Sequence, residues 1–263
     1  MTDHYLELAM YTAPDNVQQA NEAWLQRIHQ LLGGGRQRWD GRDLRQLWRA
    51  PQLLLTQTCG YPLMQELREQ VRVLGRPVYR LADAQDGWHC SLLLVRHDAP
   101  REDLAALRGS RAVINGFDSN TGMNLLRHSL LPLQRDGRFF AEVRVSGAHR
   151  ASLRQVADGQ AELTAVDSVT FAYLAAHAPA EVAEVRVLAR SAPSPTLPYI
   201  GARGLDAQQG ETIRAAMNQA LLELPDVARI LGIEEVQAAR AEDYQVLLDY
   251  QEQAERAGYA ELA

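Results

Sequence analysis

The sequence contains no lysine, because all 27 basic residues are arginine. This absence excludes catalysis through a lysine Schiff base, lysine-bound pyridoxal phosphate and a phosphate-binding loop that depends on lysine. Cysteine is scarce as well, since Cys59 and Cys90 are the only two among 263 residues. Two cysteines make neither a disulfide scaffold nor a four-ligand zinc site, and the sequence leaves open whether they are bonded to each other.

Long apolar runs and a basic excess are also missing. No stretch approaches the roughly 18 consecutive apolar residues that indicate a membrane span. The 33 acidic residues outnumber the 27 basic ones, and a net charge of −6 argues against nucleic acid as a partner. Residues 1–16 have neither the basic nor the apolar region of a signal peptide. We therefore expect either a cytoplasmic protein or a periplasmic one whose leader has been removed.

The residues that are present are typical of a globular α/β protein. Hydrophobic residues make up 46% of the chain and charged residues 23%. Short apolar segments typical of strands alternate with segments of helical spacing, most regularly in three units that begin at Ala112, Ala141 and Leu163. This alternation predicts a mostly parallel sheet covered by helices. Two amphipathic helices are expected near the C-terminus, at Ala207–Leu224 and Tyr244–Ala257.

Short polar loops follow four of the predicted strands, and each loop opens a predicted helix. They are 56–60 (Thr-Gln-Thr-Cys-Gly), 118–122 (Asp-Ser-Asn-Thr-Gly), 146–149 (Ser-Gly-Ala-His) and 167–168 (Asp-Ser). A helix start carries free backbone N–H groups and a partial positive charge, which together attract anions. Helix capping explains each loop on its own. Four such loops at the carboxyl ends of parallel strands predict a shared site for an anion or a small polar ligand.

Two side chains in these loops are candidates for chemistry. Cys59 precedes a predicted helix, a position that activates a thiol as a nucleophile, although a small buried residue at a strand end is the other interpretation. His149 opens a helix and is either a ligand contact or a surface residue. No histidine spacing typical of a metal site, such as H-x-x-x-H, occurs in the chain. We expect neither a metal nor a cofactor.

In their order and spacing, these segments resemble the phosphate, phosphite and phosphonate substrate-binding proteins of ABC transporters, the PhnD-like family. The resemblance runs from Leu6 to about Gly201. Its strongest segments are 54–62 (Leu-Leu-Thr-Gln-Thr-Cys-Gly-Tyr-Pro), 107–113 (Leu-Arg-Gly-Ser-Arg-Ala-Val), 119–122 (Ser-Asn-Thr-Gly), 146–153 (Ser-Gly-Ala-His-Arg-Ala-Ser-Leu), 156–162 (Val-Ala-Asp-Gly-Gln-Ala-Glu) and 165–170 (Ala-Val-Asp-Ser-Val-Thr). The resemblance implies a solute-binding protein whose ligand is a small phosphorus oxyanion and whose partner is an ABC permease.

The resemblance also implies a type II periplasmic-binding-protein fold, in which two α/β lobes flank a ligand cleft. The chain is expected to cross between the lobes near Arg96–Pro100 and again near Arg186–Ala192. One lobe would then comprise residues 1–96 plus 189–263, and the other residues 97–188. In such a fold the bound ligand closes the lobes by a hinge motion.

The ligand contacts implied by the resemblance come from both lobes. They are Ser119, Asn120, Thr121, His149, Asp167 and Ser168 in the second lobe, and Gln57, Thr58 and Tyr61 in the first. Asp167 is expected either to accept a proton from a protonated phosphonate or to bind a substrate amine. The chain departs from the family at Asn120, where serine or threonine is usual. It also departs in the short segment 83–91, where an aromatic ligand contact is lost or is replaced by Trp88 or His89.

Two other classes of function stay open at this level. One is an enzyme on the same fold that acts on a small metabolite, with Cys59 as nucleophile and Asp167 or His149 as base, because a fold does not fix a function. Selective alkylation of Cys59 would indicate this enzyme. The other is an interaction module with a vestigial cleft, in which the C-terminal amphipathic helices pack on a partner. A stable dimer that buries the cleft mouth would indicate the module.

Overall fold

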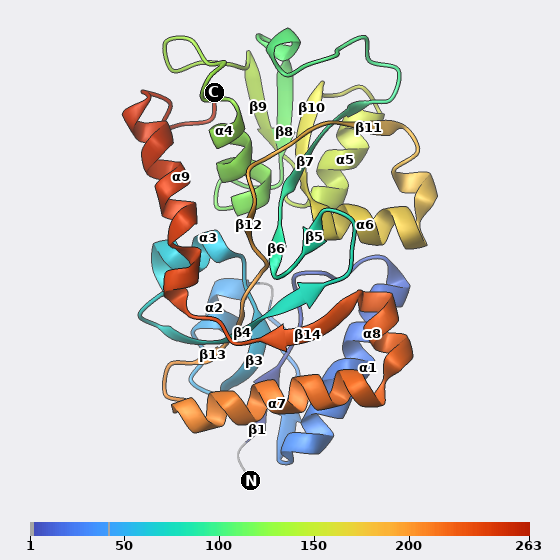
Figure 1. Cartoon of the computed structure of the whole chain (residues 1–263), viewed down its shortest axis with the longest axis vertical. Coiled ribbons are helices and arrows are strands. Elements are labelled where there is room, and N and C mark those ends of the chain that lie inside the picture. Colours follow the sequence, from blue (N-terminus) through green and yellow to red (C-terminus); the bar gives the residue numbers. More distant parts are fainter. Residues whose placement is uncertain (1–2, 42) are drawn as a thin grey trace. The chain divides into compact units, whose positions relative to one another are not determined.

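The computed structural model describes residues 3–41 and 43–263, which fold into two α/β units (Figure 1). The first unit comprises the described residues up to Trp88 together with Pro195–Gln245, and the second comprises His89–Ser194 and Val246–Ala263. The chain therefore passes between the units three times, after Trp88, Ser194 and Gln245. Short strands flank the first two of these passages: β5 (Ala84–Gln85), β6 (Trp88–His89) and β12 (Ser194–Pro195).

This division differs from the predicted lobes, residues 1–96 plus 189–263 and residues 97–188, because residues 89–96, 189–194 and 246–263 all belong to the second unit. The strand β7 (Ser91–Arg96) lies in the second unit because it pairs with strands of that unit on both sides. The C-terminal segment also belongs to the second unit. Its Leu247 carbonyl accepts a hydrogen bond from Asn124 Nδ2 at 3.0 Å, and the Ala263 carbonyl accepts one from the amide of Phe139 at 2.6 Å.

The first unit is built on a six-stranded sheet with the order β14-β4-β13-β3-β1-β2. Its strands are β1 (Asp3–Leu6), β2 (Gly35–Gln37), β3 (Leu53–Gln57), β4 (Val71–Tyr79), β13 (Tyr199–Ala202) and β14 (Ile233–Gln237). Its helices are α1 (Asp15–Leu32), α2 (Leu44–Trp48), α3 (Gly60–Pro62), η1 (Leu63–Leu67), α7 (Ala207–Glu223), α8 (Pro225–Leu231) and η5 (Ala241–Tyr244). The strands β2, β1 and β3 run parallel, whereas β13, β4 and β14 are paired antiparallel.

The helix α1 shows how the sequence pattern produces this packing. Val17, Trp24 and Ile28 are apolar residues at helical spacing in this helix, and all three are buried. The indole Nε1 of Trp24 donates to the carbonyl of Met217 in α7 at 3.0 Å, which ties the two helices together. The helix ends at Gly33, whose φ of 71° is easily reached only by glycine.

The second unit is built on a five-stranded sheet with the order β11-β7-β10-β8-β9. Besides β7, its strands are β8 (Arg111–Ile114), β9 (Glu142–Val145), β10 (Leu163–Asp167) and β11 (Val185–Arg190). Its helical elements are η2 (Ala105–Leu107), η3 (Asn120–Asn124), α4 (Leu125–Ser129), α5 (His149–Ala157), α6 (Ser168–His177) and η4 (Pro179–Glu181), and α9 (Gln245–Arg256) follows the last passage. The prediction of a mostly parallel sheet holds for this unit, because β8, β9, β10 and β11 run in one direction and β7, which pairs antiparallel with β10 and β11, runs against them. The sheet of the first unit is mixed.

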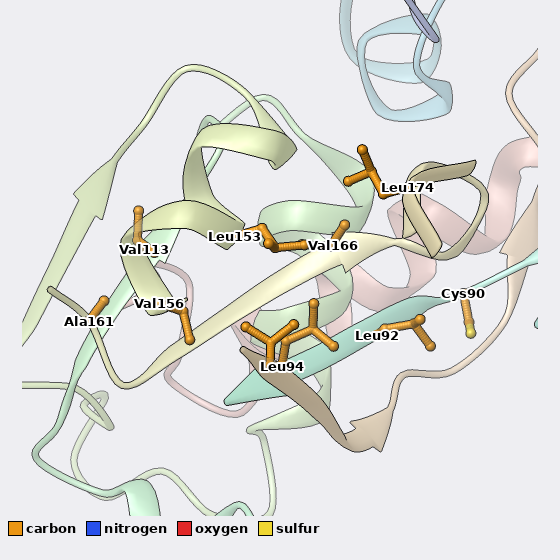
Figure 2. Packing of buried hydrophobic residues seen from close by; sticks show 10 residues of the cluster. Cys90, Leu92, Leu94, Val113, Leu153, Val156, Ala161, Val166 and Leu174 are labelled. Atoms are coloured by element: carbon orange, nitrogen blue, oxygen red, sulfur yellow. The ribbon is translucent and has the colours of Figure 1, made fainter. Parts of the chain in front are cut away.

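A continuous apolar core fixes the helices of the second unit on their sheet. Leu153 and Val156 of α5 and Leu174 of α6 pack against Val113 and Val166 of the strands (Figure 2). Each fully buried side chain of this size contributes roughly 1.5–3 kcal/mol. The core therefore holds the first residues of α5 and α6 in place relative to the strand ends that precede them. Within residues 3–41 and 43–263, none of the helices combines the length and apolar character that a membrane span requires.

Candidate functional site

The carboxyl ends of three neighbouring strands in the second unit meet at one sheet edge. The central strand β8 is parallel to β10 on one side and to β9 on the other. Three of the four predicted polar loops leave this edge: 118–122 lies beyond β8, 146–149 follows β9, and 167–168 joins β10 to α6. The fourth loop, 56–60, follows β3 and belongs to the first unit. The prediction of one shared sheet edge thus holds for three loops and was wrong for the fourth.

The loops after β8 and β9 are joined by a hydrogen bond between two predicted ligand contacts. The hydroxyl Oγ1 of Thr121 lies 3.1 Å from Nε2 of His149. Ser119 caps the first of these loops, because its Oγ accepts the amide of Gly122 at 3.0 Å. Ser119 and Thr121 are buried, and His149 is partly buried as the first residue of α5. Three of the predicted contacts therefore lie together at this edge.

Asp167 ends β10 and caps α6. Its Oδ1 accepts the amides of Val169 at 2.9 Å and Thr170 at 3.1 Å, so the carboxylate satisfies two free N–H groups of the helix start. Burial alone would raise the pKa of Asp167, but the charge of His89 and its hydrogen bond outweigh burial and lower that pKa. Asp167 is consequently ionised at neutral pH.

His89 also belongs to this cluster, although the resemblance implied it only as one of two residues that could replace a lost aromatic ligand contact. Its Nδ1 lies 3.0 Å from Oδ2 of Asp167, and its side chain is 0% exposed. The contact arises because β7 runs antiparallel to β10, with Ser91 as the register partner of Asp167. The residues just before β7 therefore lie at the same edge as the residues just after β10. Nothing in the sequence signals this antiparallel pairing, so periodicity and spacing were unable to identify His89.

The second imidazole of the cluster is held neutral by its surroundings. Burial lowers the pKa of His149, while the charge of Asp167 and the backbone of Ala165 act in the opposite direction and His89 adds to the lowering. At neutral pH the Thr121–His149 hydrogen bond thus joins two uncharged groups, and the tautomer of His149 decides which one donates.

Asn120 and Ser168, two further predicted contacts, have partners in the framework of the second unit. The amide Nδ2 of Asn120 donates to Oγ of Ser194 at 3.0 Å, and its Oδ1 accepts from Asn124 Nδ2 at 3.3 Å. The hydroxyl of Ser168 accepts the amide of Cys90 at 3.4 Å. Both side chains are buried. They brace the loop between β8 and α4 and the start of α6, and their contact with ligand stays a prediction.

The three predicted contacts of the first unit lie at the end of β3 and the start of α3. Gln57 donates through Nε2 to the carbonyl of Leu197 at 3.2 Å, and the hydroxyl of Thr58 donates to the carbonyl of Cys59 at 3.3 Å. Tyr61 is buried in α3. These residues share one end of the first unit's sheet, and their role as ligand contacts also stays a prediction.

Both cysteines are buried and neither forms a disulfide, which answers the question that the sequence left open. Cys59 precedes α3, which continues directly into η1. Cys90 packs in the apolar core of the second unit beside Leu92. In the part of the chain that the structure describes, no group of three or more His, Cys, Asp or Glu side chains is placed to hold a metal ion.

The architecture is that of the periplasmic binding proteins, two-lobed solute-binding proteins. A binding-protein component of an ABC phosphonate transporter from Pseudomonas aeruginosa has a TM-score of 0.81 and 14% identity, with 97% of this chain and 87% of that one covered. PhnD1 from Prochlorococcus marinus, solved with methylphosphonate, has a TM-score of 0.77 and 12% identity over 97% and 98%. A Xanthomonas citri protein bound to ATP has a TM-score of 0.67 and 17% identity over 98% of each chain.

The sequence identifies the family within this class. Residues 50–244 match the model of the ABC transporter phosphonate periplasmic substrate-binding proteins, and the chain belongs to that family. No curated protein matches the chain. Membership confirms the predicted resemblance and the α/β fold class, and it implies a small-molecule ligand and a permease partner.

Proposed function

We propose that this protein is a solute receptor that binds a small phosphorus oxyanion, namely phosphate, phosphite or a phosphonate, for an ABC permease. The observation that carries this proposal is the hydrogen bond between Thr121 and His149. It brings together two loops that the family resemblance names as phosphoryl contacts, at the sheet edge where α5 and α6 begin. Ser119, in the same loop as Thr121, supplies a further hydroxyl.

The chemistry of this edge suits an oxyanion without lysine or arginine. Fixed hydroxyls and helix-start N–H groups stabilise negative charge because they are oriented in advance and shielded from water. The neutral imidazole of His149 donates or accepts according to its tautomer, so it accommodates a phosphoryl oxygen or a P–OH group. Gln57, Thr58 and Tyr61 of the first unit, and Asn120 and Ser168 of the second, complete the proposed set of contacts.

The cluster favours binding over catalysis. An enzyme that used Asp167 as its general base would need that carboxylate free to take a proton. Both carboxylate oxygens are engaged instead, Oδ1 by two helix amides and Oδ2 by His89. We therefore propose that the protein is not an enzyme and that it releases its ligand unchanged.

A binding screen of the purified full chain tests this function. The panel holds phosphate, phosphite, methylphosphonate, 2-aminoethylphosphonate, sulfate and thiamine. Thermal unfolding is measured first with each compound, and isothermal titration calorimetry then measures the Kd. A ligand at 100 times its Kd adds about 2.7 kcal/mol to the free energy of unfolding, which raises Tm visibly. We expect a shift with a phosphorus oxyanion and none with sulfate, and no product after prolonged incubation. The absence of a shift with every phosphorus compound would overturn the proposal.

A pair of identical substitutions shows whether binding occurs at the proposed edge. Thr121→Val removes the hydroxyl that bonds to His149, and we expect ligand affinity to fall about tenfold or more, corresponding to about 1.4 kcal/mol. Thr164→Val is the matched control, because Thr164 is buried in the same sheet and its hydroxyl has no hydrogen-bond partner among the described residues. Equal affinities of the two variants would place the ligand elsewhere.

A further inference from the structure

We propose that a cavity in the second unit is a further binding site, which takes a small monocarboxylate with an apolar body. The cavity has a volume of about 360 Å³ and is lined by Phe117, Met123 and Arg127 together with residues 260–262. All of these residues belong to the second unit. The contacts proposed for the phosphorus oxyanion are not among the described residues that line this cavity. The inference therefore goes beyond the proposed function and does not depend on it.

Arg127 is a buried cation whose hydrogen-bond partners carry no charge. It lies in α4, beside the C-terminal segment, and is 5% exposed (Figure 1). Its Nη1 donates to the carbonyl of Ala260, and its Nη2 donates to Oδ1 of Asn124 at 2.9 Å. Among the described residues, no acidic side chain forms an ion pair with Arg127. A buried charge is costly unless an opposite charge compensates it, so an anionic ligand would stabilise this guanidinium.

The unused donors of Arg127 distinguish an anion from a cation as the ligand. Nε is buried and has no hydrogen-bond partner in the described part of the chain. Buried polar atoms are nearly always hydrogen-bonded, so this N–H needs an acceptor. A guanidinium group presents its N–H donors in a planar fork, and a carboxylate accepts two parallel bonds from that fork. An ammonium group has only donors and satisfies none of them.

The other residues that line the cavity define the rest of the ligand. Phe117, Met123 and Leu262 are apolar, and Phe117 is 55% exposed whereas the other two are buried. An apolar body that covers Phe117 removes its surface from water, which favours binding. Glu261 is exposed and lines the same cavity, so its negative charge opposes a second negative charge on the ligand. One buried cation and this carboxylate together favour a single carboxylate over a dianion.

Three five-carbon ligands test the chemical class on the full chain. Pentanoate, pentylamine and glutarate share their chain length and differ in their charged groups, and isothermal titration calorimetry compares their Kd values. We expect pentanoate to bind about tenfold or more tightly than either of the others. The inference would be overturned by a failure of pentanoate to bind, or by equal affinity of either of the other two ligands.

Competition with a phosphonate separates this cavity from the proposed oxyanion edge. Phe117 precedes and Met123 follows the loop that carries Thr121, so binding in the two places has to be distinguished. We expect the same Kd for pentanoate with and without excess methylphosphonate. Displacement of pentanoate by methylphosphonate would place the carboxylate at the oxyanion edge and overturn the inference. If methylphosphonate does not bind, that result concerns the proposed function alone, and substitutions then locate pentanoate.

Two substitutions and their controls assign pentanoate to the cavity. Arg127→Gln keeps an amide donor but removes the charge and the fork, and we expect the Kd of pentanoate to rise about tenfold or more. Arg154→Gln is the matched control, because Arg154 is exposed in α5 and lies outside the lining of the cavity. If Arg127→Gln does not fold, Phe117→Ala changes an exposed side chain and should also weaken binding about tenfold. Leu222→Ala, at a residue that is 78% exposed in α7, should leave the Kd unchanged. An unaltered Kd in folded Arg127→Gln or in Phe117→Ala would overturn the inference.

Discussion

Thr121 lies in the loop after β8 and His149 in the loop after β9, yet Oγ1 of Thr121 lies 3.1 Å from Nε2 of His149. The contact depends on the parallel pairing of β8 with β9, which places the elements that follow these strands at one edge of the sheet. The hydrogen bond therefore forms only when the loops after β8 and β9 lie next to each other at this edge of the sheet.

The first prediction concerns the pH dependence contributed by His149. Burial lowers the pKa of the folded-state imidazole below 6.5, so the unfolded chain binds a proton that the folded chain does not. The stabilisation is fully present above pH 6.5 and is lost as the pH falls through the lowered folded-state pKa. Urea unfolding between pH 5 and 8 should show this loss in the native protein, and His149→Gln should lose less stability over the same range. A difference between the two proteins that does not vary with pH would contradict the assignment.

The second prediction concerns Asp167. Asp167→Ala removes both the helix cap and the partner of buried His89, and breaking a buried pair in this way costs roughly 3–5 kcal/mol. Asp167→Asn keeps an oxygen for the amides of Val169 and Thr170, so its loss in the free energy of unfolding should be clearly smaller. Denaturant unfolding at pH 7 measures both losses.

The same carboxylate has a defined effect at acidic pH. Because the pKa of Asp167 is lowered in the folded state, its contribution is present above pH 3.8 and disappears as the pH falls through the lowered value. Asp167→Asn should lack this part of the acid dependence. Equal destabilisation by alanine and asparagine at pH 7 would show that the cap contributes nothing.

The sequence predicted the helices and loops of this site better than it predicted which strands pair with each other. Periodicity placed α5 and α6 within a residue of their observed starts, at His149 and Ser168, because each combines an apolar face with a capping loop. Strand pairing was not accessible in the same way. Whether β7 pairs parallel or antiparallel depends on contacts between distant segments, and a short apolar run such as Ser91–Arg96 carries no mark of its direction.

The consequence of the missed pairing is visible in one residue. His89 lies beside Asp167 only because β7 is antiparallel to β10. The loop at 56–60 shows the same limit, since the predicted strand before it is real but belongs to the other unit's sheet. The polar loops and the helices that they open could thus be predicted from the sequence, whereas the residues that lie next to each loop could be identified only from the tertiary structure.

The third prediction concerns the cysteines and the enzyme alternative. Cys59 and Cys90 are buried and form no disulfide, so a thiol reagent reaches either sulfur only after the chain opens locally or unfolds. Titration with a chromogenic disulfide should find close to no reactive thiol in the folded protein and both thiols in denaturant. Rapid and selective modification of Cys59 in the folded protein at neutral pH would instead support a nucleophilic cysteine.

The fourth prediction concerns the close packing of the loop that carries Thr121. A Cβ added at Gly122 would lie 1.7 Å from Oδ1 of Asn115 and 3.1 Å from Oγ of Ser119. Gly122→Ala therefore forces Asn115 out of its position and disturbs the bond by which Ser119 caps the loop. Overpacking of this kind costs about 1–3 kcal/mol, and ligand affinity should fall with it because Thr121 is displaced as well.

A glycine in a helix of the other unit provides the contrast. In α7 a Cβ at Gly210 would meet nothing closer than 3.5 Å, at Cδ of Arg72, so Gly210→Ala fits without rearrangement. Alanine restricts the unfolded chain and favours the helix, so this variant should be more stable by about 0.5–1 kcal/mol and should bind ligand with unchanged affinity. Denaturant unfolding and calorimetry on both variants separate the two effects. If Gly122→Ala bound ligand as tightly as Gly210→Ala, the loop after β8 would not hold the anion, and the contacts proposed for Ser119 and Thr121 would have to be abandoned.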